Sequence, residues 1–152
     1  MATLNQIKDF LNEKSLAIAG VSRDPKKFGH QIFLDLKKKG YTLYPINPSA
    51  DIIENEKCYK DVDDLPDGIN HLFIVTPKNQ SGEVIKKAAN KGIQNVWIQQ
   101  MSETPECFAI ANENNINLIT NECIHMFSEP VKGIHRFHRT INKIFQRYPK
   151  PA

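Results

Sequence analysis

Short, almost wholly apolar runs alternate along the chain with amphipathic segments. The apolar runs lie at 15–20, 41–46, 72–75, 96–98 and 117–119. Their character is typical of strands that are covered on both faces, as in parallel sheets. Apolar residues recur at helical spacing in the segments 3–13, 31–39, 79–91, 105–114 and 135–148. The less regular stretch between the second and third runs is predicted to hold a minor strand at 56–59 and a helical turn at 61–66.

Individual residues mark the ends of these elements. Thr3 suits the N-cap of the first helix, because its hydroxyl can accept a bond from a free backbone N–H group. The cations Lys37–Lys39 followed by Gly40 suit the end of the second helix. Pro45 removes a donor from the second strand, so we expect that strand to be short, bulged or close to an edge.

Strict alternation of strand and helix predicts an α/β fold of the Rossmann-like, three-layer type. It has a parallel, roughly five-stranded sheet with helices on both faces, and residues 1–152 form one domain. Ligands of such sheets bind beyond the carboxyl ends of the strands. Those ends are predicted at Gly20–Gly29, Asn47–Pro48, Thr76–Pro77, Gln99–Gln100 and Asn121–His125.

The composition is typical of a folded soluble protein, and we expect the chain in the cytoplasm. It is 40% hydrophobic and 24% charged, and we expect neither a secretory signal nor a membrane span. The three cysteines, Cys58, Cys107 and Cys123, are widely spaced, which favours a reducing compartment over a disulfide framework.

Charge is distributed unevenly along the chain. Of the 20 basic and 17 acidic residues, six basic and no acidic ones lie beyond residue 130, so the body carries −3 and the tail +6. We expect this basic, amphipathic last helix, which carries Phe137, Ile141, Ile144 and Phe145, to pack across an acidic body. Basic and aromatic residues are too little clustered for a nucleic-acid module, so no nucleic-acid partner is expected.

The loop after the first strand has the composition of an anion site. Gly20 lets a ligand approach the backbone, Ser22 offers a hydroxyl, and Arg23, Lys26 and Lys27 offer cations. The helix that follows begins near Gly29, where free N–H groups favour a phosphate. The loop is therefore predicted to bind an anion.

Two departures bear on which nucleotide this loop would accept. The loop is not G-x-G-x-x-G, since its two glycines are nine positions apart. The second strand ends in Asn47–Pro48, where an NAD site would carry an acidic residue for the ribose hydroxyl. Both features weaken the prediction of an NAD site, and the absence of a P-loop lysine motif disfavours an NTPase.

Several short motifs, in order, resemble the stand-alone CoA-binding domain family, which is related to the N-terminal domain of the succinyl-CoA synthetase α subunit. The matching strings are Ile18–Pro25, Phe28–Gly29, Gly40–Tyr41, Tyr44–Pro48, Cys58–Tyr59, Asp64–Pro66, Thr76–Pro77 and Val96–Gln99. The resemblance implies a site for the nucleotide end of coenzyme A on the loops named above. The implied cofactor-binding residues are Gly20, Val21, Ser22, Arg23, Lys26, Lys27, Phe28, Gly29, Asn47, Pro48, Thr76, Pro77 and Gln99.

The resemblance also implies a role for each part of this set. Gly20, Ser22 and Arg23 would line the phosphates, and Lys26 or Lys27 would lie near the 3′-phosphate. Asn47 and Pro48 would border the adenosine. The pantetheine path would be lined by Thr76, Pro77 and Gln99.

The function that follows is non-catalytic binding of coenzyme A or an acyl-CoA, and a homo-oligomer is compatible with it. Two alternatives stay open: an NAD(P)-binding oxidoreductase-type domain, and an interaction domain with a vestigial nucleotide site. No catalytic or metal-binding residue is assigned. The remaining candidates are a His135–His138 half-site for a metal, the neighbours Cys123 and His125 at a strand end, and His30, which suits a phosphate contact or a polar helix position.

Overall fold

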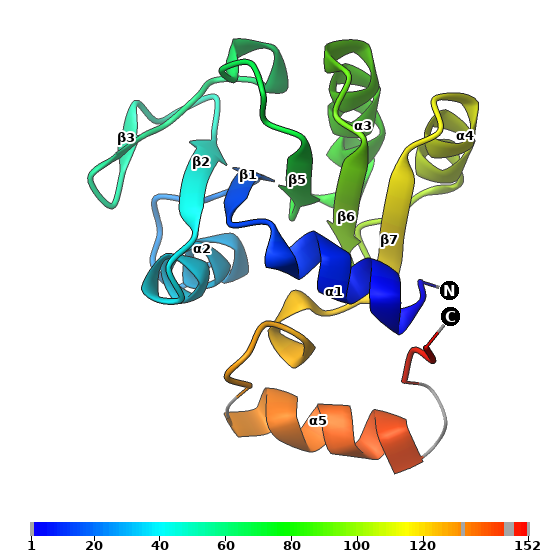
Figure 1. Ribbon diagram of the computed structural model, residues 1–152. Coiled ribbons are helices and arrows are strands. Elements are labelled where there is room, and N and C mark those ends of the chain that lie inside the picture. Colours follow the sequence, from blue (N-terminus) through cyan, green and yellow to red (C-terminus); the bar gives the residue numbers. More distant parts are fainter. Residues whose placement is uncertain (1, 132, 145–147, 152) are drawn as a thin grey trace.

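A computed structural model describes residues 2–131, 133–144 and 148–151. Its main sheet has the strand order β2-β1-β5-β6-β7, and all neighbouring pairs are parallel. The strands are β1 (Ser15–Ala19), β2 (Thr42–Ile46), β5 (His71–Ile74), β6 (Asn95–Gln99) and β7 (Asn117–Glu122). The helices are α1 (Leu4–Asn12), α2 (Phe28–Lys38), α3 (Lys78–Lys91), α4 (Pro105–Glu113) and α5 (Gly133–Ile144). This arrangement confirms the predicted α/β fold (Figure 1).

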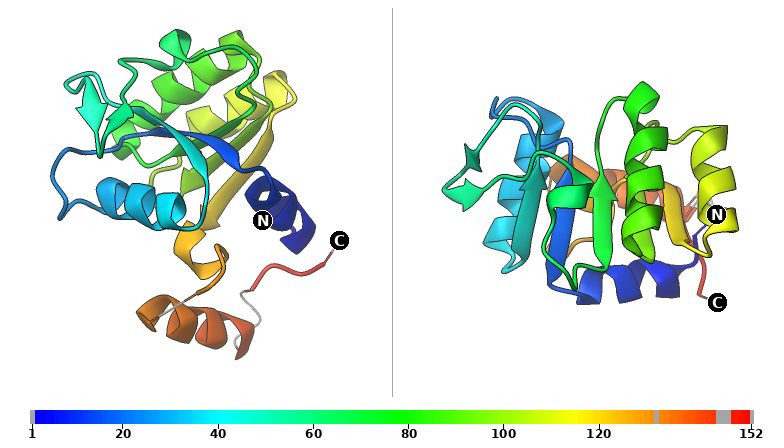
Figure 2. Two further views of the ribbon diagram at one scale, coloured as in Figure 1. Left: turned by 60° about the vertical axis from the view of Figure 1, so that its left-hand side comes forward. Right: turned by 90° about the horizontal axis from the view of Figure 1, so that it is seen from above.

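The sheet separates two apolar cores. Along β5, Phe73 packs toward one core, whereas its neighbours Leu72 and Ile74 pack into the other, as alternate side chains of a strand must. The first core joins the sheet to α1, α2 and the segment after β7, and the second joins it to α3 and α4. Figure 2 shows the sheet between these helical layers. The largest fully buried side chains, Trp97 and Phe33, lie in the first core.

Strand β2 forms one edge of the sheet, as Pro45 predicts. Pro45 lies opposite Ile18 in the register of β1 and β2, at a position where an edge strand tolerates the missing donor. On the outer side of β2, the Tyr59 N–H group donates to the Pro45 carbonyl over 2.8 Å, and the Asn47 N–H group donates to the Tyr59 carbonyl over 2.9 Å. The irregular stretch thus covers an edge that would otherwise be open.

Within that stretch the chain forms a small hairpin and one helical turn. The hairpin pairs β3 (Ile52–Ile53) with β4 (Glu56–Lys57), so the predicted minor strand at 56–59 is shorter than expected. The predicted turn is the 3₁₀ helix η1 (Val62–Asp64), capped by the Asp61 carboxylate.

After β7 the chain forms the 3₁₀ helix η2 (Ile124–Met126) and then α5, which lies apart from α3 and α4 (Figure 1). An ion pair between Arg139 and Glu129 holds α5 to the segment that precedes it. Phe137 on this helix is 62% exposed. The helix predicted over residues 135–148 includes residues 145–147, which lie outside the described residues. Over the described residues, no helix has the length and apolar character needed to cross a bilayer.

Candidate functional site

The candidate site lies at the carboxyl ends of β1 and β5, where the strand order reverses. From β1 the chain crosses to β2 on one side, and β5 then adds to the other side of β1. This reversal opens a crevice above the sheet, which is where open α/β sheets bind their ligands.

Two glycines allow the loop between β1 and α2 to press against the end of β5. Gly20 has a φ of 98°, and a Cβ atom there would lie 2.8 Å from the backbone of Val75 and Thr76. A Cβ atom at Gly29 would lie 2.4 Å from the Gly20 carbonyl oxygen. Both contacts are shorter than real side chains allow, so the floor of the crevice requires glycine at these positions.

Side chains on neighbouring elements hold this loop in place. The Asn47 amide donates to the Val21 carbonyl over 2.7 Å, which ties the end of β2 to the end of β1. The His30 ring, 2% exposed, donates from Nδ1 to the Ser22 carbonyl over 2.7 Å, and its Nε2 lies 3.1 Å from a Glu54 carboxylate oxygen. Of its two predicted roles, His30 therefore fills that of a polar helix residue, and it braces the loop.

One cavity, of about 440 Å³, lies between the ends of β1 and β2, the turn η1 and helix α3. Its charged wall centres on Lys87, which pairs with Asp61 and, over 3.2 Å, with Glu83. These two carboxylates raise the pKa of Lys87 and so keep its ammonium group charged. The lining residues are Ala19, Gly20, Ser22, Ile46, Asn47, Pro48, Lys60, Asp61, Val62, Thr76, Pro77, Gln80, Glu83, Val84 and Lys87.

A second cavity, of about 560 Å³, extends from the same loop toward the end of β6. Its polar wall includes Gln99, which is 5% exposed and whose Oε1 accepts a bond from the Ile124 N–H group over 3.4 Å. Its rim carries Met101, which is 82% exposed and has a φ of 72°. The lining residues are Gly20, Ser22, Lys27, Phe28, Gly29, Val75, Thr76, Pro77, Gln99, Gln100, Met101 and Ser102.

The two cavities share Gly20, Ser22, Thr76 and Pro77, and together they form one groove across the crevice, called the cofactor groove below. A family model for a CoA binding domain matches residues 14–129, which include every strand of the main sheet and both walls of this groove. The chain belongs to the CoA-binding domain family. The resemblance predicted from its sequence motifs is therefore confirmed.

Relatives of this CoA-binding domain include much longer proteins. It is 28% identical to the α subunit of an ADP-forming acetate–CoA ligase II of Pyrococcus furiosus over 90% of this chain and 30% of that subunit. It is 31% identical to an ADP-forming acetate–CoA ligase of Methanocaldococcus jannaschii over 96% of this chain and 21% of the ligase. The chain thus spans less than a third of the length of these ligases.

A solved structure of similar size has the same fold. The hypothetical protein from Pyrococcus horikoshii OT3 superposes with a TM-score of 0.77 at 26% identity, and the match covers 88% of this chain and 98% of that protein. The Rossmann-like architecture of this domain therefore also occurs in a small protein.

The structure gathers most of the sequence-predicted site residues around the groove. Ten of the thirteen line one or both cavities: Gly20, Ser22, Lys27, Phe28, Gly29, Asn47, Pro48, Thr76, Pro77 and Gln99. Val21 is fully buried, so its side chain belongs to the apolar core and only its carbonyl serves the loop. Arg23 and Lys26 are exposed on the loop and line neither cavity.

The wall formed by η1 and α3 is absent from the sequence prediction. It contributes Asp61, Gln80, Glu83 and Lys87. The last three are spaced three and four residues apart on the predicted helix 79–91, so they share one face. That polar face, directly after the Thr76–Pro77 strand end, is the signal that could have located this wall.

The other sequence candidates, Cys123, His125, His135 and His138, do not line the groove. Cys123 is 5% exposed within the first core, where its thiol is covered by apolar side chains. Within residues 2–131, 133–144 and 148–151, no three His, Cys, Asp or Glu side chains are placed to hold a metal ion. His135 lies instead beside His125, with ring centroids 4.7 Å apart.

Proposed function

We propose that residues 1–152 act as one domain that binds coenzyme A or an acyl-CoA in the cofactor groove without catalysing a reaction. The observation that carries the proposal is the continuity of the two cavities at Gly20, Ser22, Thr76 and Pro77, at the strand-order reversal of a CoA-binding family member. Coenzyme A is a long molecule with a nucleotide at one end and a flexible arm at the other. Such a molecule can occupy two cavities that meet at the β1–α2 loop, where its phosphates would lie.

The phosphates are proposed to lie against the β1–α2 loop. The first turn of α2 presents free N–H groups there, and its N-cap, Lys27, has a side chain free of any capping bond. Arg23 and Lys26 extend into solvent from the same loop, where they can reach a phosphate at the mouth of the groove. Coenzyme A carries about four negative charges, so cations on this loop contribute attraction that salt screens.

The adenosine is proposed to occupy the cavity beside Asn47 and Pro48, and the pantetheine arm the cavity beside Gln99. The second cavity suits such an arm because it combines the Gln99 amide and the Thr76 hydroxyl with the apolar surfaces of Phe28 and Val75. Amide groups of the arm can bond to the former while its methylene groups pack on the latter.

The non-catalytic part of the proposal rests on the small share of the related ligases that this chain spans. This chain matches only 30% and 21% of the length of the two ligases named above, so their whole activity is not proposed for it.

Calorimetric titration tests the proposal. We expect binding of coenzyme A and acetyl-CoA, weaker binding of dephospho-CoA, which lacks the 3′-phosphate, and no comparable binding of NAD or NADP. Preference for NADP would instead support the oxidoreductase-type alternative. Absence of binding by any of these compounds would support the vestigial-site alternative.

Variants of the loop cations test the placement of the phosphates. Arg23→Ala combined with Lys26→Ala is expected to weaken binding about tenfold or more and to flatten its dependence on salt. Lys8→Ala, on the exposed face of α1, is the control and should bind as the unaltered protein does. Unchanged affinity in the double variant would contradict the placement.

A further inference from the structure

A third cavity, of about 470 Å³, lies between α2 and the segment that runs from η2 into α5. It shares no lining residue with either cavity of the cofactor groove. Among its described lining residues, most carry positive charge, can acquire it, or donate hydrogen bonds. They are Gln31, Asp35, Lys38, Lys39, His125, Pro130 and His135.

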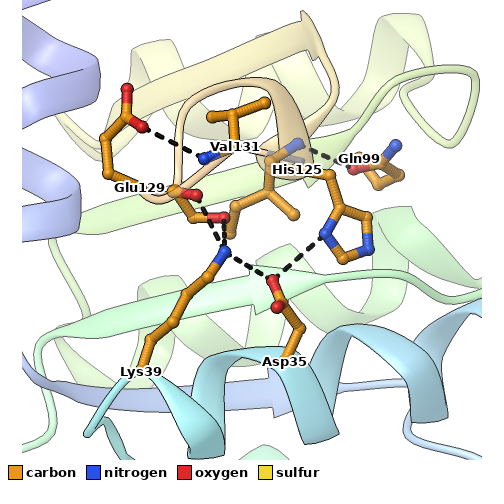
Figure 3. Close-up of polar contacts among 8 residues, drawn as sticks. Asp35, Lys39, Gln99, His125, Glu129 and Val131 are labelled. Atoms are coloured by element: carbon orange, nitrogen blue, oxygen red, sulfur yellow. Dashed lines mark hydrogen bonds and ion pairs between the residues drawn. The ribbon is translucent and has the colours of Figure 1, made fainter. Parts of the chain in front are cut away.

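Lys39 is fixed in position at this cavity. Its ammonium group lies 2.7 Å from an Asp35 carboxylate oxygen and donates to the Ser128 carbonyl over 2.8 Å and to the Ser128 hydroxyl over 3.0 Å (Figure 3). Its side chain is 12% exposed. These bonds use its three donors, so Lys39 supplies a fixed positive charge rather than a free donor.

His125 is oriented by the same carboxylate. Its Nδ1 atom lies 3.3 Å from the Asp35 carboxylate, which leaves Nε2 as its second ring nitrogen for a ligand. Figure 3 shows the His125 ring directed toward Asp35. The side chain of His125 is 14% exposed. The His135 ring from α5 lies beside it, so two imidazoles meet in one cavity.

Both imidazoles are more readily protonated when an anion binds beside them, because nearby negative charge raises the pKa of a histidine. Burial lowers the pKa of His125, and the neighbouring His135 and Lys39 lower it further, while Asp35 opposes this. Burial likewise lowers the pKa of His135, with His138 adding to the effect.

The other charged groups of the packed elements do not cancel the positive character of the cavity. Lys38 lines it from α2 and is exposed. Glu129, on the connecting segment, is paired with Arg139 of α5. The lining lysines thus outnumber Asp35, before either histidine takes up a proton.

We propose that this third cavity is a second binding site, separate from the cofactor groove, for a small oxyanion of the sulfate or phosphate class. The anion would lie between Lys38 and the two imidazoles, with Lys39 contributing charge from behind. His125 takes up a proton from solvent when its Nε2 donates to the anion, because its Nδ1 already faces Asp35 and only the protonated ring donates from both nitrogens. The negative charge of the anion likewise favours the protonated form of His135. Cations are disfavoured by the two lysines.

Histidine-resolved NMR titration tests the site, with sulfate as the probe because its charge stays constant over the pH range used. Sulfate is added against chloride at matched ionic strength, and the histidine pKa values are followed. We expect the pKa of His125 and His135 to rise and that of His71 to stay unchanged. His71 is the internal control, because burial also lowers its pKa but it lies beside α1, against Phe10. Sulfate affinity should increase up to about tenfold per pH unit for each proton taken up as pH falls from about 8 to about 6.

Two variants separate the site from general charge effects. Lys38→Gln is expected to weaken sulfate binding severalfold, and His135→Gln to reduce its pH dependence, while Lys8→Gln changes neither. Both altered side chains of the site lie at the surface of the cavity, and thermal unfolding checks that each variant is folded.

The proposal would be overturned if the pKa values of His125 and His135 did not change on addition of sulfate, or if the pKa of His71 rose by the same amount. Coenzyme A provides a further test, since the Phe28 ring contacts the His125 ring with centroids 5.6 Å apart and also lines the cofactor groove. Sulfate binding that persists at saturating coenzyme A supports a separate site. Complete displacement with an equal competition constant would show that the cavity belongs to the cofactor groove. Sulfate binding can succeed even if coenzyme A does not bind, so failure of the two proposals is distinguishable.

Discussion

Glu122, the last residue of β7, is a carboxylate placed where its charge is costly. The residue is 4% exposed, and burial raises the pKa of its carboxyl group from 4.5 to about 7. Replacing it by glutamine keeps the size and polarity of the side chain but removes the charge. Glu122→Gln should therefore stabilise the fold, relative to the unaltered protein, wherever the carboxyl group is ionised in the unfolded chain.

The magnitude and sign follow from the two pKa values. Below about pH 4.5 the carboxyl group is protonated in both the folded and the unfolded chain, so its ionisation carries no penalty. As pH rises toward the folded value of about 7, only the unfolded chain gives up its proton freely, and the free energy of unfolding falls. The separation between 4.5 and about 7 corresponds to about 3 kcal/mol.

Urea unfolding at intervals between about pH 5 and pH 8 measures this difference. We expect the free energy of unfolding of Glu122→Gln, relative to the unaltered protein, to increase with pH by up to about 3 kcal/mol and to level off above pH 7. Glu113→Gln, at an exposed position on α4, is the matched control. A difference that stays constant with pH for Glu122→Gln would refute the reasoning.

Three further substitutions test the packing and the site. Gly29→Ala places a methyl group 2.4 Å from the Gly20 carbonyl oxygen, so we expect a loss of about 1–3 kcal/mol in the free energy of unfolding and weaker coenzyme A binding by calorimetry. Thr3→Ala removes the hydroxyl that accepts from the Gln6 N–H group, and urea unfolding should show a loss of about 1 kcal/mol in the free energy of unfolding. An unchanged free energy of unfolding would mean that this N-cap does not stabilise the fold. Phe33→Ala empties a fully buried position and should cost about 3–5 kcal/mol in the same assay, with a much smaller loss indicating that the core closes over the gap.

Most of the fold could be predicted because its strands are buried on both faces. Continuous apolar runs identified every strand of the main sheet, but not their ends. β7 extends past its apolar run to Glu122, because pairing with β6 resumes at Gln99 after an irregularity. Asn121 in that extension has a φ of 62°, a backbone conformation that an apolar pattern cannot signal.

The site could be predicted less completely than the fold. Strand ends located the loops, since the carboxyl ends of parallel strands meet at one edge. The side chain of Val21 turns into the core, and this depends on the local path of the loop rather than on its composition. The wall containing Lys87 was missed because the helical pattern gives the polar face of α3, whereas the position of η1 opposite that face depends on tertiary packing.

The proposed function is tested most directly by following backbone amide signals while coenzyme A is added. Binding in the cofactor groove predicts saturable shifts at Gly20, Ser22, Thr76 and Gln99, with little change at His71 at the opposite end of β5. Absence of shifts at saturating concentrations, or shifts confined to the amino ends of the strands, would contradict the account.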